Sequence, residues 1–214
     1  MRSTNGALFA LLFAALPVCL AQEWEIGAAA GYGVHRDATV TAPAGSGKAG
    51  FKPGLAVGAI VGHNMYDRLG GEIRYTYRFS DLRVSGGGEE AEFDGETHVI
   101  NYDLLYHFAD NGETIRPFVA GGGGMKLFRG LGTEHAFQPA NAFALLTKTQ
   151  EIQGLISAGA GVKVAVSDHW NVRFEFHDYI TRFPKDVVAP AAGAKIGNWL
   201  HDFVGMVGVT YSFE

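Results

Sequence analysis

The chain has 214 residues, with 17 lysines and arginines against 22 aspartates and glutamates, so its formal net charge is −5. This length suits one domain with room for a targeting segment, and the acidic balance excludes nucleic acid as an expected partner. High glycine and aromatic contents (Gly 30, Phe 15, Tyr 8, Trp 3) with only 7 prolines favour crowded strands and membrane interfaces over helices.

Residues 1–21 are typical of a cleaved signal peptide, with Arg2 before an apolar core and small or medium residues ahead of a cleavage site at Gln22. The apolar run is shorter than the ~20 residues that span a bilayer. A buried N-terminal helix and lipoprotein cleavage at Cys19 are the alternatives. Cys19 is the only cysteine, so a mature domain of residues 22–214 has no disulfide, thiolate metal site or cysteine nucleophile, and its net charge becomes −6.

Apolar and polar residues then alternate with period two, which indicates extended strands with two unlike faces. Some segments alternate less clearly and are rich in glycine and alanine. We interpret them as strands too, because glycine permits the close approach and bending that a narrow closed sheet requires. In chain order, the eight expected strands lie at about 23–34, 51–63, 73–79, 100–108, 115–128, 151–166, 172–177 and 203–213.

Short and long connections alternate between these segments. The short ones are 64–68, 110–113 and 167–169, and the long ones are 35–50, 84–95, 129–149 and 184–198. This alternation predicts an all-β fold, an eight-stranded antiparallel up-and-down β-barrel with turns at one rim and loops at the other. The last strand is expected to close the barrel against the first.

The size of the side chains indicates which face meets which solvent. An eight-stranded barrel interior is only just wide enough for side chains to fill, so the large rings are expected outside, on lipid. The expected lipid-facing rings are Tyr75, Tyr77, Phe79, Tyr102, Tyr106, Phe174, Phe176, Tyr211 and Phe213. The opposite face carries small residues and balanced charges, and the expected interior polar network is Glu25, Glu72, Arg74, Arg78, Asp103, Arg116, Lys126, Lys163, Arg173, Glu175, His177 and Asp202. The barrel is therefore expected to be transmembrane.

Aromatic residues also gather at two heights, as expected of two membrane interfaces. The turn-end girdle is predicted to contain Trp24, Tyr66, Phe108, Trp170, Tyr211 and Phe213. The loop-end girdle is predicted to contain Tyr32, Phe51, Phe79, Phe128, Tyr179, Phe183, Trp199 and Phe203.

Three stretches carry a resemblance to a known family: Gly208-Val-Thr-Tyr-Ser-Phe213, Arg116-Pro-Phe-Val-Ala-Gly-Gly-Gly123 and Asn171-Val-Arg-Phe-Glu-Phe-His-Asp-Tyr179. The mature chain resembles the eight-stranded outer-membrane β-barrel domains, similar in plan to the transmembrane domain of outer membrane protein A and to the opacity-type adhesins. The resemblance implies that Gly208, Tyr211 and Phe213 form the C-terminal signal read by the barrel assembly machinery. Glu214 after the final aromatic residue and Met206 at a usually polar position depart from the family pattern.

Two motifs could suggest chemistry. Gly45-Ser-Gly-Lys-Ala-Gly50 matches G-x-G-x-x-G, but it follows a long loop and precedes a strand, whereas a phosphate-binding loop follows a strand and precedes a helix; a flexible surface loop is expected. Some eight-stranded barrels are lipid A deacylases with a His-x-Ser motif, and here His177-Asp-Tyr179 lacks the serine. We therefore expect no enzyme activity, no cofactor and no metal.

Ion pairs inside the barrel are expected to form across strands. Arg173 and Glu175, two positions apart on one face, are too far apart for ideal pairing with each other. We expect Arg173 to pair with Asp202, and Glu175 with Arg74 or Arg78.

These observations predict a structural or interaction protein of the bacterial outer membrane, with a plugged polar interior and four surface loops. A narrow channel for small solutes is the alternative; a lipid-modifying enzyme and a soluble lipocalin-like carrier follow. Expected partners are outer-membrane lipid and lipopolysaccharide, the barrel assembly machinery, and an extracellular ligand bound through 35–50, 84–95, 129–149 and 184–198. The protein is expected to be a monomer. Loop 129–149, with Phe137, Phe143, Leu145 and Leu146, is open to three roles: contact with the membrane surface, contact with a partner, or folding over the barrel mouth.

Overall fold

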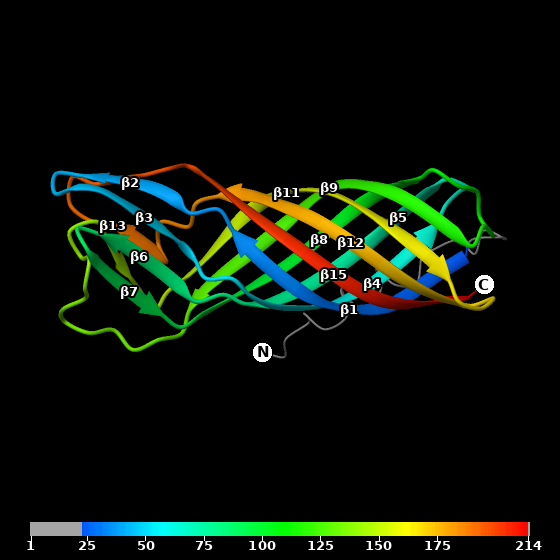
Figure 1. The fold of residues 1–214 in the computed structure, drawn as a ribbon, viewed down its shortest axis with the longest axis horizontal. Helices are drawn as coiled ribbons and strands as arrows, with labels where there is room; N and C mark the ends of the chain where they lie inside the picture. The colour runs from blue at the N-terminus through cyan, green and yellow to red at the C-terminus, as the bar shows by residue number, and fades with distance from the viewer. Residues whose placement is uncertain (1–22, 214) are drawn as a thin grey trace, which may run out of the picture.

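Eight long antiparallel strands form a closed barrel in the computed structural model, which describes residues 23–213 (Figure 1). In spatial order the barrel runs β1-β15-β12-β11-β9-β8-β5-β4, and β1 and β15 close it. The strands are β1 (Glu23–His35), β4 (Gly54–Asn64), β5 (Leu69–Phe79), β8 (Gly95–His107), β9 (Ile115–Gly130), β11 (Gln150–Ala165), β12 (Trp170–Arg182) and β15 (Trp199–Phe213). This architecture confirms the predicted all-β barrel; the predicted signal peptide, residues 1–21, lies outside the described residues.

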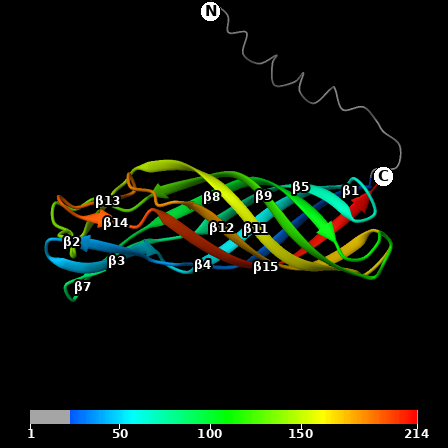
Figure 2. The ribbon, with the colours of Figure 1, turned by 90° about the horizontal axis from the view of Figure 1, so that it is seen from above.

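The barrel strands are 11 to 16 residues long and run obliquely around the barrel, as the view from above shows (Figure 2). At a rise of about 3.3 Å per residue and a tilt of about 45°, such strands span the ~25 Å apolar band of an outer membrane. Within the described residues, no helix is long and apolar enough to cross a membrane.

Side chains alternate between the two faces of the wall as the sequence predicts. Of the nine rings expected on lipid, eight are exposed, from Tyr211 at 36% to Phe79 at 55%, and Tyr77 is half-buried. Polar side chains such as Arg74 and Glu72 are buried on the inner face. The apolar face of the final strand therefore points outward, away from the barrel interior.

Glycine is required where neighbouring strands of the barrel wall approach each other closely. A Cβ atom added to Gly122 on β9 would overlap the carbonyl oxygen of Tyr102 and lie 2.8 Å from Asp103 Cα on β8. The glycine-rich run of β9 is thus a consequence of close backbone approach.

The long connections are not loops, which corrects the sequence prediction. They contain seven further strands: β2 (Ala38–Ala42), β3 (Gly45–Phe51), β6 (Leu82–Gly86), β7 (Glu89–Phe93), β10 (Ala144–Leu146), β13 (Val188–Pro190) and β14 (Lys195–Ile196). They pair as a five-stranded sheet, β14-β2-β3-β6-β7, and a two-stranded sheet, β10-β13. The pairing joins all four connections into one structure, the cap, which extends one end of the barrel (Figures 1 and 2). The segment expected to be a flexible loop, 45–50, belongs to β3.

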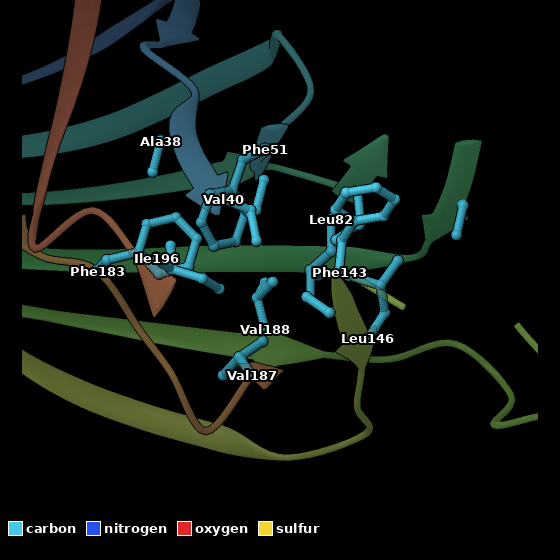
Figure 3. Packing of buried hydrophobic residues seen from close by; sticks show 14 of the residues in the cluster. Ala38, Val40, Phe51, Leu82, Phe143, Leu146, Phe183, Val187, Val188 and Ile196 are labelled. Carbon is cyan, nitrogen blue, oxygen red and sulfur yellow. The ribbon is translucent and has the colours of Figure 1, made fainter. Parts of the chain in front are cut away.

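The cap has its own hydrophobic core, shown in Figure 3. Val40, Leu82, Val187, Val188 and Leu200 are fully buried in it, and burial of such side chains contributes roughly 1.5–3 kcal/mol each. This burial explains how the short strands of the cap form sheets that would not be stable alone.

The cap core also corrects the predicted loop-end girdle. Phe51, Phe128 and Phe183 are buried in the cap core, with the rings of Phe51 and Phe128 5.3 Å apart, and they do not face lipid. The loop 129–149 supplies Phe143 and Leu146 to the same core, so this segment folds over the barrel mouth, and Phe137 and Leu145 stay exposed.

Candidate functional site in the barrel interior

Four charged side chains form the centre of the barrel interior. Arg74 on β5 contacts both carboxylates, with Nη2 2.5 Å from Glu72 Oε1 and 2.9 Å from Glu175 Oε2. Arg173 on β12 donates from both terminal nitrogens to Glu72 at 3.1 Å, and from Nε to Glu175 at 2.9 Å. All four side chains are buried, so two guanidinium groups and two carboxylates neutralise one another across the barrel.

His177 and Asp103 lie beside this quartet. His177 Nδ1 lies 3.7 Å from Asp103 Oδ2, and its Nε2 lies 3.9 Å from Glu175 Oε2. Ser157 donates a 3.3 Å hydrogen bond to Asp103. The serine therefore faces a carboxylate and not the histidine, so this cluster lacks the nucleophile–base contact of an acyl-transfer site.

A second group of charges lies toward the turn end. Lys163 and Thr210 both donate to Glu25, and Arg116 donates to the Asn111 side chain at 3.1 Å and to the Asp67 carbonyl at 2.9 Å. A cavity of about 470 Å³ that opens at the turn end is lined by Glu25, Asn111, Arg116 and Lys163 of this group. The lining of the cavity is mainly polar, with asparagines, Ser167 and Ser212 beside the charged groups.

The third group of charges lies toward the cap. Asp202 on β15 accepts hydrogen bonds from Arg78 and Lys126, and its Oδ2 lies 3.3 Å from His35 Nε2. Arg78 also donates to the Gly33 carbonyl at 3.0 Å. Directly beyond this group, the Lys126 ammonium lies 5.0 Å from the centre of the Phe128 ring, which belongs to the cap core.

The barrel interior also contains an apolar layer. The sequence prediction missed it, because the predicted interior had charged, polar and small residues only. The members of the layer are Ala29, Ala56, Ile60, Val99, Leu155, Tyr179, Val204 and Met206. Tyr179 is 1% exposed and stacks on His177, so its predicted place in the outer girdle is wrong. The alternation along β12 already indicates this, because Tyr179 shares the parity of Arg173, Glu175 and His177. Met206 occupies its unusual position because this layer is apolar.

All residues of the predicted interior network are buried inside the barrel, but their partners differ in part from those expected. Arg74 pairs with Glu175 as expected. Arg173 and Glu175 do contact each other, contrary to expectation, with Arg173 Nη2 2.8 Å from Glu175 Oε2. Asp202 pairs with Arg78 and Lys126, so its expected pairing with Arg173 is wrong.

Two polar clusters on the outer wall near the cap were also missed. His98 Nδ1 lies 2.8 Å from the Tyr75 hydroxyl and its Nε2 lies 3.2 Å from Glu96, which accepts a hydrogen bond from Arg129 at 2.6 Å. On the other side, His201 Nδ1 lies 2.8 Å from Asp178. Parity predicts their outward direction, since Glu96 and His98 continue the series of Ile100 and Tyr102. They lie where the exposed apolar wall gives way to polar residues.

The cap contains a cavity of about 350 Å³ between β7 and the segment that precedes β10, lined by Asp81, Glu90, Glu92, Phe93, His135 and Phe137 among others. Its carboxylates are partly used, since Lys52 bonds Glu92 at 2.9 Å, and this hydrogen bond raises the pKa of Lys52. Over residues 23–213, no group of three or more His, Cys, Asp or Glu side chains is arranged to hold a metal ion.

Comparison with known proteins gives one family. A family profile described as outer membrane protein beta-barrel domain matches residues 11–213. A search of curated protein sequences found no match.

Several solved structures share the fold. OprG from Pseudomonas aeruginosa is 12% identical with a TM-score of 0.57, covering 89% of this chain and 96% of its own. Neisserial surface protein A is 14% identical with a TM-score of 0.53, covering 89% and 97%. The outer membrane protein AlkL, determined in lipid bilayers, is 13% identical with a TM-score of 0.51, covering 89% and 90%. At these identities the similarity shows the fold alone.

Proposed function

Since the chain belongs to the outer membrane protein beta-barrel domain family, we propose that it is a structural and interaction protein of the bacterial outer membrane whose interior is closed to solutes and whose cap faces the outside. Export requires a leader, and we propose that residues 1–21 are removed before Gln22. Mass determination of the membrane-extracted protein tests this cleavage.

The observation that carries the proposal is the stack of side chains along the barrel axis. Each end of the central Glu72–Arg173 quartet is followed by another ion-paired group, and the group at the cap end is followed by the cap core. A solute crossing the barrel would have to separate buried ion pairs, which costs about 3–5 kcal/mol for each broken pair. It would then have to pass a packed hydrophobic core.

Lipid is the proposed partner of the outer wall, because a contiguous wall of exposed large apolar side chains is unsuited to water. The cap surface is the proposed place for an extracellular ligand, since Phe137 is 69% exposed beside the cap cavity. During assembly, Gly208, Tyr211 and Phe213 are proposed to act as the recognised C-terminal signal. Tyr211 and Phe213 support this role by facing outward, where another protein can reach them.

Ion conductance tests the closed interior. Refolded protein inserted in planar lipid bilayers is expected to give no stable conductance steps, with an open porin as the positive control and boiled protein as the negative one. Stable single-channel steps from the folded form would contradict the proposal.

Those steps would favour the second candidate, a narrow channel. The polar cavity of about 470 Å³ at the turn end is the observation on its side, because Glu25 and Lys163 line it. Replacement of Glu25 by Gln would then change the ion selectivity of the steps.

A further inference from the structure

A basic cavity interrupts the outer surface where the barrel wall meets the cap. It has a volume of about 460 Å³ and lies at the ends of β11, β12 and β15. Arg182, Lys185, Asn198 and Trp199 contribute exposed side chains, and Glu151 and Gln153 are half-buried at its base.

The cavity lies at the edge of the apolar wall. Arg182 is the last residue of β12 and is paired in register with Trp199 on β15, which is 58% exposed. Below Arg182 on the same face of β12 come Ile180 and Asp178, which lies 2.8 Å from His201, and then Phe176 and Phe174, both exposed. On β11, Gly154 lies next to Leu155, which is the register partner of Thr181 on β12. A Cβ atom added to Gly154 would meet nothing within 4 Å. The wall beside Arg182 is therefore open at the level where tryptophan marks a membrane interface.

The positive charges of this cavity are available to a ligand. The guanidinium of Arg182 has no hydrogen bond or ion pair to any residue in the described range 23–213. Lys185 donates only to the neutral Asn198 amide, at 3.1 Å. Glu151, the one acidic residue that the described part of the chain contributes to the lining, already accepts hydrogen bonds from the Asp186 backbone at 2.7 Å and from the Gln153 side chain.

We propose that this cavity binds a phosphate group of an outer-leaflet lipid headgroup, as in lipid A. An arginine fork and a lysine are the side chains that recognise phosphate, and the free Arg182 fork can bind two phosphate oxygens at once. Trp199 packs beside the sugar or glycerol portion, and the acyl chains run down the exposed wall over Phe176. The assignment rests on the outer-membrane placement proposed above, but not on a closed interior.

Binding of defined lipids to the refolded protein in detergent tests the site. The probes are bisphosphorylated lipid A, the same lipid after removal of its phosphates, and inorganic phosphate, with bound lipid measured by native mass spectrometry. We expect the wild type to bind the phosphorylated form about tenfold more tightly than the dephosphorylated form, as expected for charge-assisted hydrogen bonds. We expect the double variant R182Q/K185Q to lose this preference.

The matched control is K48Q/K52Q, which removes the same charge at the same end of the molecule, from the exposed Lys48 on β3 and from the half-buried Lys52 just after it, which bonds Glu92. It should keep the preference. Retention of the preference by R182Q/K185Q, or an equal loss in both variants, would overturn the site. Displacement of lipid A by millimolar inorganic phosphate would overturn the assignment to a lipid. Because none of these readouts involves conductance, failure here and failure of the closed interior are separable.

Discussion

The interior ion pairs are satisfied only as a set. Glu72 accepts from Arg74 and from both terminal nitrogens of Arg173, and Glu175 accepts from the same two arginines. Each charge has lost its hydration, so its stability depends on partners donated by strands on the opposite side of the barrel. Removing one partner therefore leaves a buried charge that the remaining groups cannot fully neutralise.

For Arg173→Met, we expect a loss of about 3–5 kcal/mol in the free energy of unfolding, because Glu72 loses two hydrogen bonds. The double variant Glu72→Gln/Arg173→Met keeps the interior charge balanced and should lose less than the sum of the two single variants. Urea unfolding in lipid vesicles, followed by gel mobility, measures all three. Arg129→Gln breaks an ion pair on the outer wall and should cost under about 1 kcal/mol. Strict additivity of the two interior substitutions would contradict the coupling.

For a single residue, the sequence predicts which face of the barrel wall its side chain lies on, but not which residue it pairs with. Period two determines which side chains face inward, which is why Arg74, Asp103 and Asp202 are placed correctly. A strand shifted by two residues keeps this parity but changes every partner. The contact of Arg173 with Glu72 depends on how far the strands are staggered around the whole barrel, and neither residue carries that information.

Among the elements, the cap is the least expected. Its strands are 2 to 7 residues long, and β3, with sequence GSGKAGF, has almost no apolar alternation. Such segments fold because β3 pairs with β2 and with β6, which come from different connections. A pattern within one connection cannot reveal pairing between two, whereas the barrel strands, with 11 residues or more, show clear alternation or glycine spacing.

A disulfide tests the pairing of the first two connections. Lys48 on β3 and Ser85 on β6 are register partners on the solvent side of the cap. Residues 23–213 contain no cysteine, so the double variant Lys48→Cys/Ser85→Cys in a chain starting at Gln22 has only these two thiols. They should oxidise spontaneously, because facing Cβ atoms lie about 4.5–5.5 Å apart and a small backbone shift brings them to the ~3.5–4.5 Å of a disulfide. Non-reducing gels with thiol counting measure the yield. Lys48→Cys/Glu113→Cys, with one cysteine at each end of the molecule, is the control. Equal yields in the two variants would mean that the connections are not paired.

At the scale of the whole molecule, closure is the property that the sequence predicts best. Eight segments, alternating short and long connections, and the outward rings together indicate a barrel that meets lipid outside. The cap adds a second kind of closure, because its packed core continues the stack of side chains beyond the end of the barrel. Among residues 23–213, the turn end has no comparable cover: the connections there are short, and Arg68 and Asp110 form an exposed pair in which the arginine lowers the pKa of the Asp110 carboxyl.

Gly122 and Gly205 allow closure itself to be tested with the same change at two sites. A closed membrane barrel stays compact in SDS until it is boiled, so the temperature at which its gel mobility changes reports the stability of closure. Gly122→Ala would place a methyl group against the β8 backbone, and we expect a loss of about 1–3 kcal/mol, seen as conversion at lower temperature. At Gly205 an added Cβ meets nothing within 4 Å, so Gly205→Ala should convert at or above the wild-type temperature, because alanine restricts the unfolded chain. If the two variants converted alike, the close approach of β9 to β8 would not limit closure. If the wild type showed no heat-dependent shift at all, the barrel would not be closed in the membrane.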